Sequence, residues 1–257
     1  MRRFVVIVQA RENSVRLPKK VIKILNGKPL IKYIIERIES LNLANLELRF
    51  AIPNIGNDTL NKLLVDLEQR IYRGDEYDVL NRYISASKDL SGRDWIIRLT
   101  ADNPFVDHDA IASIVKTLST TSDLPHYAYA TGLPLGMGFE LFQVEKLREI
   151  SLLAKEKHQR EHVTVYFREH KLNYIIKEFP CYPQFDFNYH EKQIRLTIDE
   201  QADFQMAQKV LQQFKNNIYF NAGDILKLFN QQPNFFLQNL HIHQKLATSS
   251  QNEYKKN

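Results

Sequence analysis

The charged side chains that could do chemistry gather first in a loop near the N-terminus. An apolar run at residues 4–8 is followed by residues 9–20, which carry four basic side chains, Arg11, Arg16, Lys19 and Lys20. Arginine offers forked donors and lysine a compact charge, a combination that suits phosphate groups. Lys28 follows at the start of an expected helix, where free backbone N–H groups favour an anion. The pattern predicts a polyphosphate site. A solvated basic loop is the alternative, since neither standard glycine-rich phosphate motif occurs in the sequence.

Two similar segments, about 100 residues apart, each place a carboxylate after an expected strand. Residues 98–102 read R-L-T-A-D and residues 195–199 read R-L-T-I-D, so the segments end at Asp102 and Asp199. Carboxylates at neighbouring strand ends can share Mg²⁺, which commonly binds one or two carboxylates together with substrate phosphates. A single aspartate at a strand end is more often a helix cap, so the metal prediction depends on the pair.

The elements that must position these loops alternate between short apolar runs and amphipathic helices. In the first half we expect strands at residues 4–8, 46–52, 71–72 and 95–99, and helices at residues 29–38, 57–68, 75–89 and 107–119. Beyond residue 125 we expect strands at 127–129, 139–142, 173–179 and 194–198, and helices at 144–154, 158–170, 200–214 and 221–231. The alternation predicts an α/β fold with a mostly parallel, Rossmann-like sheet and helices on both faces. Such sheets bind ligands beyond the carboxyl ends of their strands.

Length and charge narrow the function classes. The chain has 257 residues with 35 Lys and Arg against 30 Asp and Glu. Residues 1–50 carry a net charge of +7 and the remaining 207 carry −2, so the excess surrounds the basic loop. This distribution favours a small polyphosphate ligand over a nucleic acid. No apolar run is long enough for a membrane span, and the single cysteine, Cys181, excludes an intrachain disulfide, as suits a cytoplasmic protein.

Eight ordered motifs between residues 3 and 215 carry a family resemblance. They are I-V-Q-A-R at 7–11, S-V-R-L-P at 14–18 with Lys20 shortly after it, G-K-P-L-I at 27–31, R-G-D-E at 73–76, D-V-L-N-R-Y at 78–83, R-L-T-A-D at 98–102, R-E-H-V-T at 160–164 and R-L-T-I-D-E at 195–200. Together they closely resemble the cytidylyltransferase family typified by the spore coat polysaccharide biosynthesis protein F group. That family is related to the enzymes that activate 3-deoxy-octulosonate and sialic acids with CTP.

The resemblance implies a GT-A-like nucleotidyltransferase that transfers CMP from CTP to a sugar, a sugar acid or a related polar acceptor. Pyrophosphate release and a role in surface polysaccharide or glycan assembly are implied with it, as is a possible homodimer. It implies one domain at residues 1–240, in which residues 130–195 form an acceptor-side insertion. The polar residues 244–257 are expected to form a disordered tail.

The resemblance also assigns roles to individual positions. It implies that Arg16 and Lys20 hold the β- and γ-phosphates and that Asp102 and Asp199 hold Mg²⁺; these four are the candidate catalytic residues. The implied nucleotide-binding residues are Gln9, Ala10, Arg11, Ser14, Arg16, Lys20, Lys28, Arg73, Asp75, Thr100 and Ala101. The implied acceptor-binding residues are Glu140, Arg160 and His162.

Two departures from the family pattern keep alternatives open. Lys19 stands where the family usually has glycine, which can change the turn of the basic loop. Gly138 stands where an aspartate is usual, so the acceptor site is altered, or the chain is an inactive nucleotide-binding homologue. Residues 158–162 also match H-x-x-E-H, the signature of a group of zinc proteases, although a third metal ligand would be needed from elsewhere.

Overall fold

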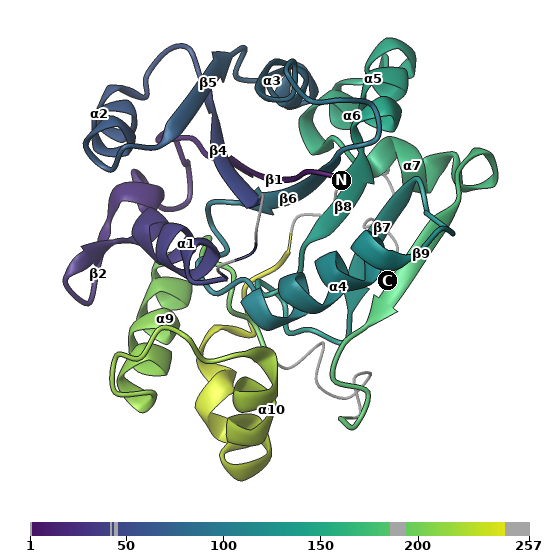
Figure 1. Ribbon diagram of the computed structural model, residues 1–257. Coiled ribbons are helices and arrows are strands. Elements are labelled where there is room, and N and C mark those ends of the chain that lie inside the picture. The colour runs from purple at the N-terminus through teal and green to yellow at the C-terminus, as the bar shows by residue number, and fades with distance from the viewer. Residues whose placement is uncertain (1, 42, 44–45, 186–193, 245–257) are drawn as a thin grey trace, which may run out of the picture.

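A seven-stranded sheet forms the centre of the computed structural model, which describes residues 2–41, 43, 46–185 and 194–244 (Figure 1). Within these residues the strand order is β5-β4-β1-β6-β8-β7-β9. The strands are β1 (Phe4–Gln9), β4 (Leu46–Pro53), β5 (Arg70–Gly74), β6 (Trp95–Thr100), β7 (Tyr127–Thr131), β8 (Glu140–Gln143) and β9 (Ile176–Pro180). A separate two-stranded hairpin joins β2 (Ile24–Leu25) to β3 (Lys28–Pro29).

Parallel pairing dominates this sheet, as expected. The strand β1 pairs in parallel with β4 and with β6, and β4 pairs in parallel with β5. The strand β8 runs antiparallel to both of its neighbours, β6 and β7, and β7 pairs in parallel with β9. The expected α/β class with a mostly parallel sheet is therefore confirmed.

Helices cover both faces of the sheet because successive residues of an inner strand such as β1 point to opposite sides. Phe4, Val6 and Val8 of β1 belong to one apolar core, and Val5 and Ile7 belong to a second. The first core is completed by α1 (Leu30–Glu39), α2 (Asp58–Asp66), α4 (His108–Thr120), α9 (Gln201–Gln213) and α10 (Ala222–Gln231). The second is completed by α3 (Val79–Ala86), α5 (Val144–Leu153) and α7 (Val165–Glu169).

Two expected elements differ in the structure. Residues 194–198 are buried but form no strand of the sheet, and are tied instead by a single bridge between Leu135 and Arg195. The helix expected at 158–170 is broken into α6 (Lys157–His162) and α7, because Val163 adopts a positive φ of 54°. The remaining expected strands and helices lie within a few residues of their predicted ranges. The helix expected at 75–89 is shorter in the structure, where it forms α3.

The expected disordered tail is described only at its first residue. Gln244 accepts a hydrogen bond from Arg195 (2.7 Å), and residues 245–257 lie outside the described part of the chain. Across the described residues, no helix combines the length and the apolar character that crossing a membrane requires.

Candidate active site

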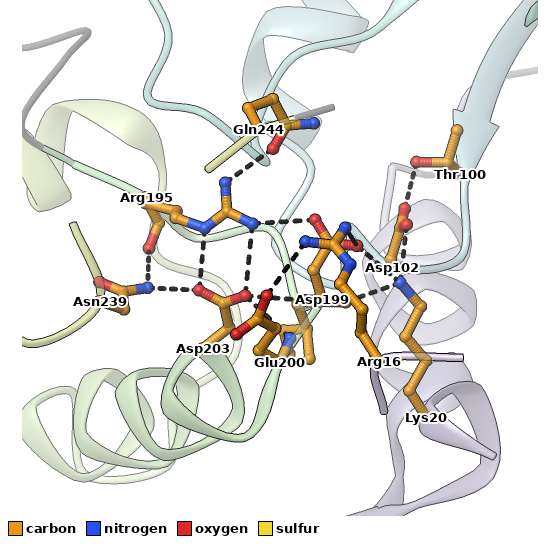
Figure 2. Close-up of polar contacts among 11 residues, drawn as sticks. Arg16, Lys20, Thr100, Asp102, Arg195, Asp199, Glu200, Asp203, Asn239 and Gln244 are labelled. Atoms are coloured by element: carbon orange, nitrogen blue, oxygen red, sulfur yellow. Dashed lines mark hydrogen bonds and ion pairs between the residues drawn. The ribbon is translucent and has the colours of Figure 1, made fainter. Parts of the chain in front are cut away.

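The two predicted aspartates lie together at the carboxyl edge of the sheet, joined by one lysine (Figure 2). The Nζ atom of Lys20 lies 2.9 Å from Oδ2 of Asp102 and 3.0 Å from Oδ1 of Asp199. It also donates to the backbone carbonyl of Ile198 at 2.8 Å. The side chains of Lys20 and Asp199 are only 11% and 10% exposed, so these charges face each other with little water between them. We call Lys20, Asp102 and Asp199, with Arg16, the carboxylate–lysine cluster.

Arg16 adds a second cation from the basic loop. Its guanidinium lies 3.1 Å from Oδ1 of Asp199 and 3.3 Å from Oε1 of Glu200. Burial works against the ionised form of Asp199, but the charges of Lys20, Arg16 and Arg195 outweigh it and lower the pKa of that carboxyl below its usual range. Asp199 is therefore ionised at neutral pH and able to act as an anionic ligand.

Strand ends and a tight turn position the cluster. Asp102 lies two residues beyond the end of β6; Ala101 N donates to Gln9 O (3.0 Å), and the Thr100 hydroxyl donates to Asp102 Oδ1 (2.6 Å). Ile198 N donates to Asp102 O (2.8 Å), which brings the segment of Asp199 beside β6 without a shared strand.

Lys20 begins the short 3-10 helix η1 (Lys20–Ile22), just after Lys19. Lys19 has φ 56° and ψ 25°, a left-handed conformation that glycine adopts without strain. The backbone at Lys19 thus has a conformation in which the glycine usual for the family would fit without strain. The Lys19 ammonium lies 3.4 Å from Glu12, so its charge points away from the cluster's two aspartates toward a different carboxylate.

A buried scaffold of three further residues holds Asp199 from behind. Arg195 donates to Asp199 Oδ2 (2.8 Å) and to Asp203 Oδ1 (2.9 Å). Asp203 also accepts from the backbone N–H of Asp199 (2.9 Å), and Asn239 donates to both Asp203 (2.8 Å) and the Arg195 carbonyl (3.0 Å). Sequence reasoning assigned no role to these three residues. The signal that could have found Asp203 is its place in the first turn of an expected helix, four residues after Asp199.

The chemistry of this donor set fits a hard divalent cation. Two carboxylates converge within 3.0 Å of one nitrogen atom, so both can reach a common ion. Among the described residues, no three His, Cys, Asp or Glu side chains gather into a closed metal site. A cation at Asp102 and Asp199 would take its other ligands from water and phosphate, the arrangement that Mg²⁺ prefers.

A second buried cluster forms around Glu140 at the start of β8. Its carboxylate accepts from Arg98 on the neighbouring β6 (2.5 Å), from Arg168 (3.0 Å), from Thr164 (2.9 Å) and from the Tyr127 hydroxyl. Arg98 also donates to the Gln9 side chain (3.2 Å), so Gln9 lies between this group and the carboxylate–lysine cluster. Glu140 thus fixes the side chains around it and has its own oxygens occupied.

Glu140 gives the chain a predicted acid sensitivity. Burial would raise the pKa of this carboxyl, but Arg98, Arg168, Tyr127 and Thr164 together lower it. The folded chain therefore binds fewer protons here than the unfolded chain. The stabilisation is present above about pH 4 and is lost as the pH falls through the folded-state pKa. We expect Glu140→Gln to lower the free energy of unfolding by about 3 kcal/mol at pH 7, because it leaves Arg98 buried without its counter-charge.

Thermal unfolding of the wild type and of Glu140→Gln between pH 3 and pH 7 measures this effect. The stability difference between the two proteins should shrink as the pH is lowered. A constant difference over that range would contradict the ionised state assigned to Glu140.

The other predicted site residues lie around this edge in separate contacts. Among the implied nucleotide-binding residues, Arg11 lies 3.7 Å from Glu76, and Lys28 pairs with Glu36 of α1. Arg73 donates to the Asn54 carbonyl, and Asp75 accepts from the backbone N–H of Tyr77 (2.7 Å). Ala10 N is bonded to Ala51 O (3.2 Å), and Ser14 N to Glu12 O (3.1 Å). Among these predicted residues, Thr100 contacts the carboxylate–lysine cluster through Asp102, whereas the Lys28 ammonium pairs with Glu36 instead.

Arg160 and His162, expected on the acceptor side, make contacts away from the carboxylate–lysine cluster. Arg160 pairs with Asp78, the N-cap of α3, at 2.7 Å, and donates to the Ala154 carbonyl (3.1 Å). His162 is half-buried, and burial and nearby cations lower the pKa of its imidazole, so it is neutral at pH 7. In the H-x-x-E-H segment, the Nε2 atom of His158 lies 2.7 Å from a carboxylate oxygen of Glu169, within hydrogen-bonding distance.

The three glycines before β8 differ in their surroundings. A Cβ atom at Gly132 or Gly136 would lie 2.2 Å from backbone atoms of Cys181 or Thr197, and both glycines have positive φ. A Cβ atom at Gly138 would meet no atom within 4 Å. The position where the family usually has aspartate is therefore open enough for a side chain.

Comparison with known proteins agrees with this geometry. The sequence model of the cytidylyltransferase family matches residues 5–242. The spore coat polysaccharide biosynthesis protein SpsF of Bacillus subtilis is 30% identical over 234 residues, which cover 88% of this chain and 94% of that protein.

Solved structures share the fold. A cytidylyltransferase from Leptospira borgpetersenii has a TM-score of 0.81 at 22% identity, over 95% of this chain and 100% of that one. A CMP:2-keto-3-deoxy-manno-octonic acid synthetase complexed with CTP has a TM-score of 0.61 at 16% identity, over 82% of this chain and 99% of that one. Since the family model spans nearly the whole described chain, this protein belongs to the cytidylyltransferase family.

Proposed function

We propose that this protein is a CTP-dependent cytidylyltransferase that activates a sugar, a sugar acid or a related polar acceptor for surface polysaccharide or glycan assembly. The observation that carries the proposal is the carboxylate–lysine cluster, in which Lys20 and Arg16 lie beside Asp102 and Asp199 at the carboxyl edge of the sheet. The names of SpsF and of the CTP-bound synthetase support the choice of nucleotide and of acceptor class.

The proposed reaction is a displacement at the α-phosphorus of CTP. An oxygen of the acceptor attacks this phosphorus, the bond from it to the bridging oxygen of the β-phosphate breaks, and pyrophosphate leaves. Arg16 and Lys20 hold the β- and γ-phosphates and neutralise the charge that develops on the leaving group. Asp102 and Asp199 hold Mg²⁺, which when bound supplies Lewis-acid stabilisation of the phosphate oxygens.

Other parts of the chain are proposed to contact either the nucleotide or the acceptor. We propose that residues 9–20 wrap the nucleotide and that Arg73 and Asp75 lie near its base and ribose. Residues 1–240 act as one domain, with the segment 130–195 on the acceptor side. Because Glu140 is already bonded to four side chains, its proposed part is to hold Arg98 and Arg168 toward the acceptor.

Pyrophosphate release tests the proposal. The purified full chain is incubated with Mg²⁺, each of the four ribonucleoside triphosphates in turn, and a panel of neutral sugars, sugar acids and sugar phosphates. We expect release that requires both CTP and one acceptor class, with formation of the corresponding CMP conjugate by mass spectrometry. Release with another triphosphate alone would move the chain to a different nucleotide, and binding of CTP without release for any acceptor would favour an inactive nucleotide-binding homologue.

A further inference from the structure

The ammonium of Lys20 is surrounded by oxygen atoms, as a bound cation would be. Its three donors meet three oxygens at 2.8 to 3.0 Å: the Ile198 carbonyl and one carboxylate oxygen each from Asp102 and Asp199. The two carboxylates are the ones that the donor chemistry assigns to a divalent ion. Figure 2 shows the Lys20 side chain reaching between them from the basic loop.

We propose that Lys20 acts as an internal cation that neutralises Asp102 and Asp199 in the nucleotide-free protein and blocks the divalent-cation site until a triphosphate draws it away. This inference rests on the proposed function, because the triphosphate is the ligand that would displace the lysine. It assigns Lys20 two successive partners: the carboxylates before the nucleotide binds, and phosphate oxygens afterwards.

Electrostatic repulsion prevents the Lys20 ammonium and a divalent cation from occupying the space between Asp102 and Asp199 at the same time. The Lys20 and Asp199 side chains are almost fully buried, so an ammonium and a divalent cation sharing the same carboxylate oxygens would repel each other strongly. A triphosphate carries several negative charges and offers Lys20 and Arg16 stronger anionic partners than the aspartates do. The flexible four-carbon stem of lysine allows its charge to move without a backbone change.

The scaffold behind Asp199 keeps the vacated site in shape. Arg195 contacts Oδ2 of Asp199, whereas Lys20 and Arg16 contact Oδ1. Departure of the two loop cations therefore frees Oδ1 while Arg195 still orients the carboxylate. Nucleotide and divalent cation should consequently bind cooperatively, each raising the affinity for the other by the same factor.

The test measures metal binding by the full chain without nucleotide, using Mn²⁺ as the probe and electron paramagnetic resonance of free Mn²⁺ as the readout. We expect Lys20→Met to bind Mn²⁺ at least about tenfold more tightly than the wild type, a gain of about 1.4 kcal/mol. Arg16→Met, which removes a cation from Asp199 but not from Asp102, should give a smaller gain. The matched control is Lys19→Met: it removes the same charge one residue away, where the partner is Glu12, and should leave Mn²⁺ affinity unchanged.

Each outcome decides the inference. Equal Mn²⁺ affinity for the wild type and Lys20→Met overturns it, and so does an equal gain in Lys19→Met, which would indicate a general charge effect. If circular dichroism shows that Lys20→Met does not fold, the comparison of Arg16→Met with Lys19→Met decides instead by the same criterion. If Lys20→Met binds Mn²⁺ more tightly but the wild type releases no pyrophosphate from any triphosphate, the proposed function is rejected. The competition between Lys20 and the metal is then retained.

Discussion

Replacing Asp102 or Asp199 by asparagine is expected to lower the rate of pyrophosphate release by about 10²-fold or more. Each substitution removes one of the two carboxylate charges that would hold the divalent cation, while the side chain keeps its size. Loss of one preorganised electrostatic partner commonly costs a factor of this order, since it acts where charge develops in the transition state. Steady-state release with saturating CTP and acceptor measures the change.

The two variants should differ in stability. Asp102 is 29% exposed, so Asp102→Asn should change the free energy of unfolding by less than about 1 kcal/mol. Asp199 is buried among Lys20, Arg16 and Arg195, so Asp199→Asn should cost about 3 kcal/mol by leaving these cations under-compensated. Asp66→Asn, at the exposed end of α2, is the control and should keep the wild-type rate. Near-normal rates in both site variants would refute the assignment of Asp102 and Asp199 to the cation.

Gly136→Ala is expected to destabilise the fold by about 3 kcal/mol or more. Gly136 has φ 98°, which alanine adopts only with strain, and its new Cβ atom would lie 2.2 Å from Thr197 N and 2.5 Å from the Leu196 carbonyl carbon. The backbone must therefore move away from the segment that ends at Asp199. We also expect activity to fall, because the hydrogen bond from Leu196 N to Leu135 O (2.7 Å) ties that segment in place.

Gly138→Ala is the matched control for this substitution. It makes the same chemical change two residues later, where the added atom meets open space, and should alter the free energy of unfolding by less than about 0.5 kcal/mol. Urea denaturation followed by circular dichroism compares the two variants. Equal stabilities would show that residues 195–199 do not pack against this loop as closely as the structure indicates.

Most of the sheet could be predicted because its central strands are buried on both faces and read as continuous apolar runs. Residues 194–198 are equally buried, with Ile194, Leu196 and Ile198 alternating with polar residues, yet they pair with one residue of the connection before β8 instead of joining the sheet. The sequence pattern indicates that such a segment is buried, but the tertiary fold determines which other segment it pairs with. The break at Val163 escaped prediction for a related reason, since a positive φ at a β-branched residue is imposed by its surroundings.

The residues of the carboxylate–lysine cluster could be picked out from the sequence, but the residues that hold them in position could not. Asp102 and Asp199 follow near-identical segments, and Arg16 and Lys20 stand in a visibly basic loop. Asn239 supports the same centre from η3 (Pro233–Asn239), where nothing in the local sequence marks it as polar scaffold. Glu140 was expected to bind the acceptor, and only the structure places Arg98, Tyr127, Thr164 and Arg168 on its oxygens.

The antiparallel direction of β8 determines where the connection between β7 and β8 lies and which of its residues can vary. Because β8 runs against β6 and β7, the chain leaves β7 and enters β8 at the same edge where the parallel strands end. The connection, residues 132–139, therefore lies at this edge, where Leu133, Met137 and Phe139 anchor it in the first apolar core and Leu135 is its one exposed residue. With room at Gly138 and a close backbone approach at Gly136, the side chains of this connection can vary while its backbone path stays fixed. Substitutions at Gly138 and Leu135 could therefore vary the surface beside Asp102 and Asp199, whereas grafting a different loop would remove the contacts that hold residues 195–199 in place.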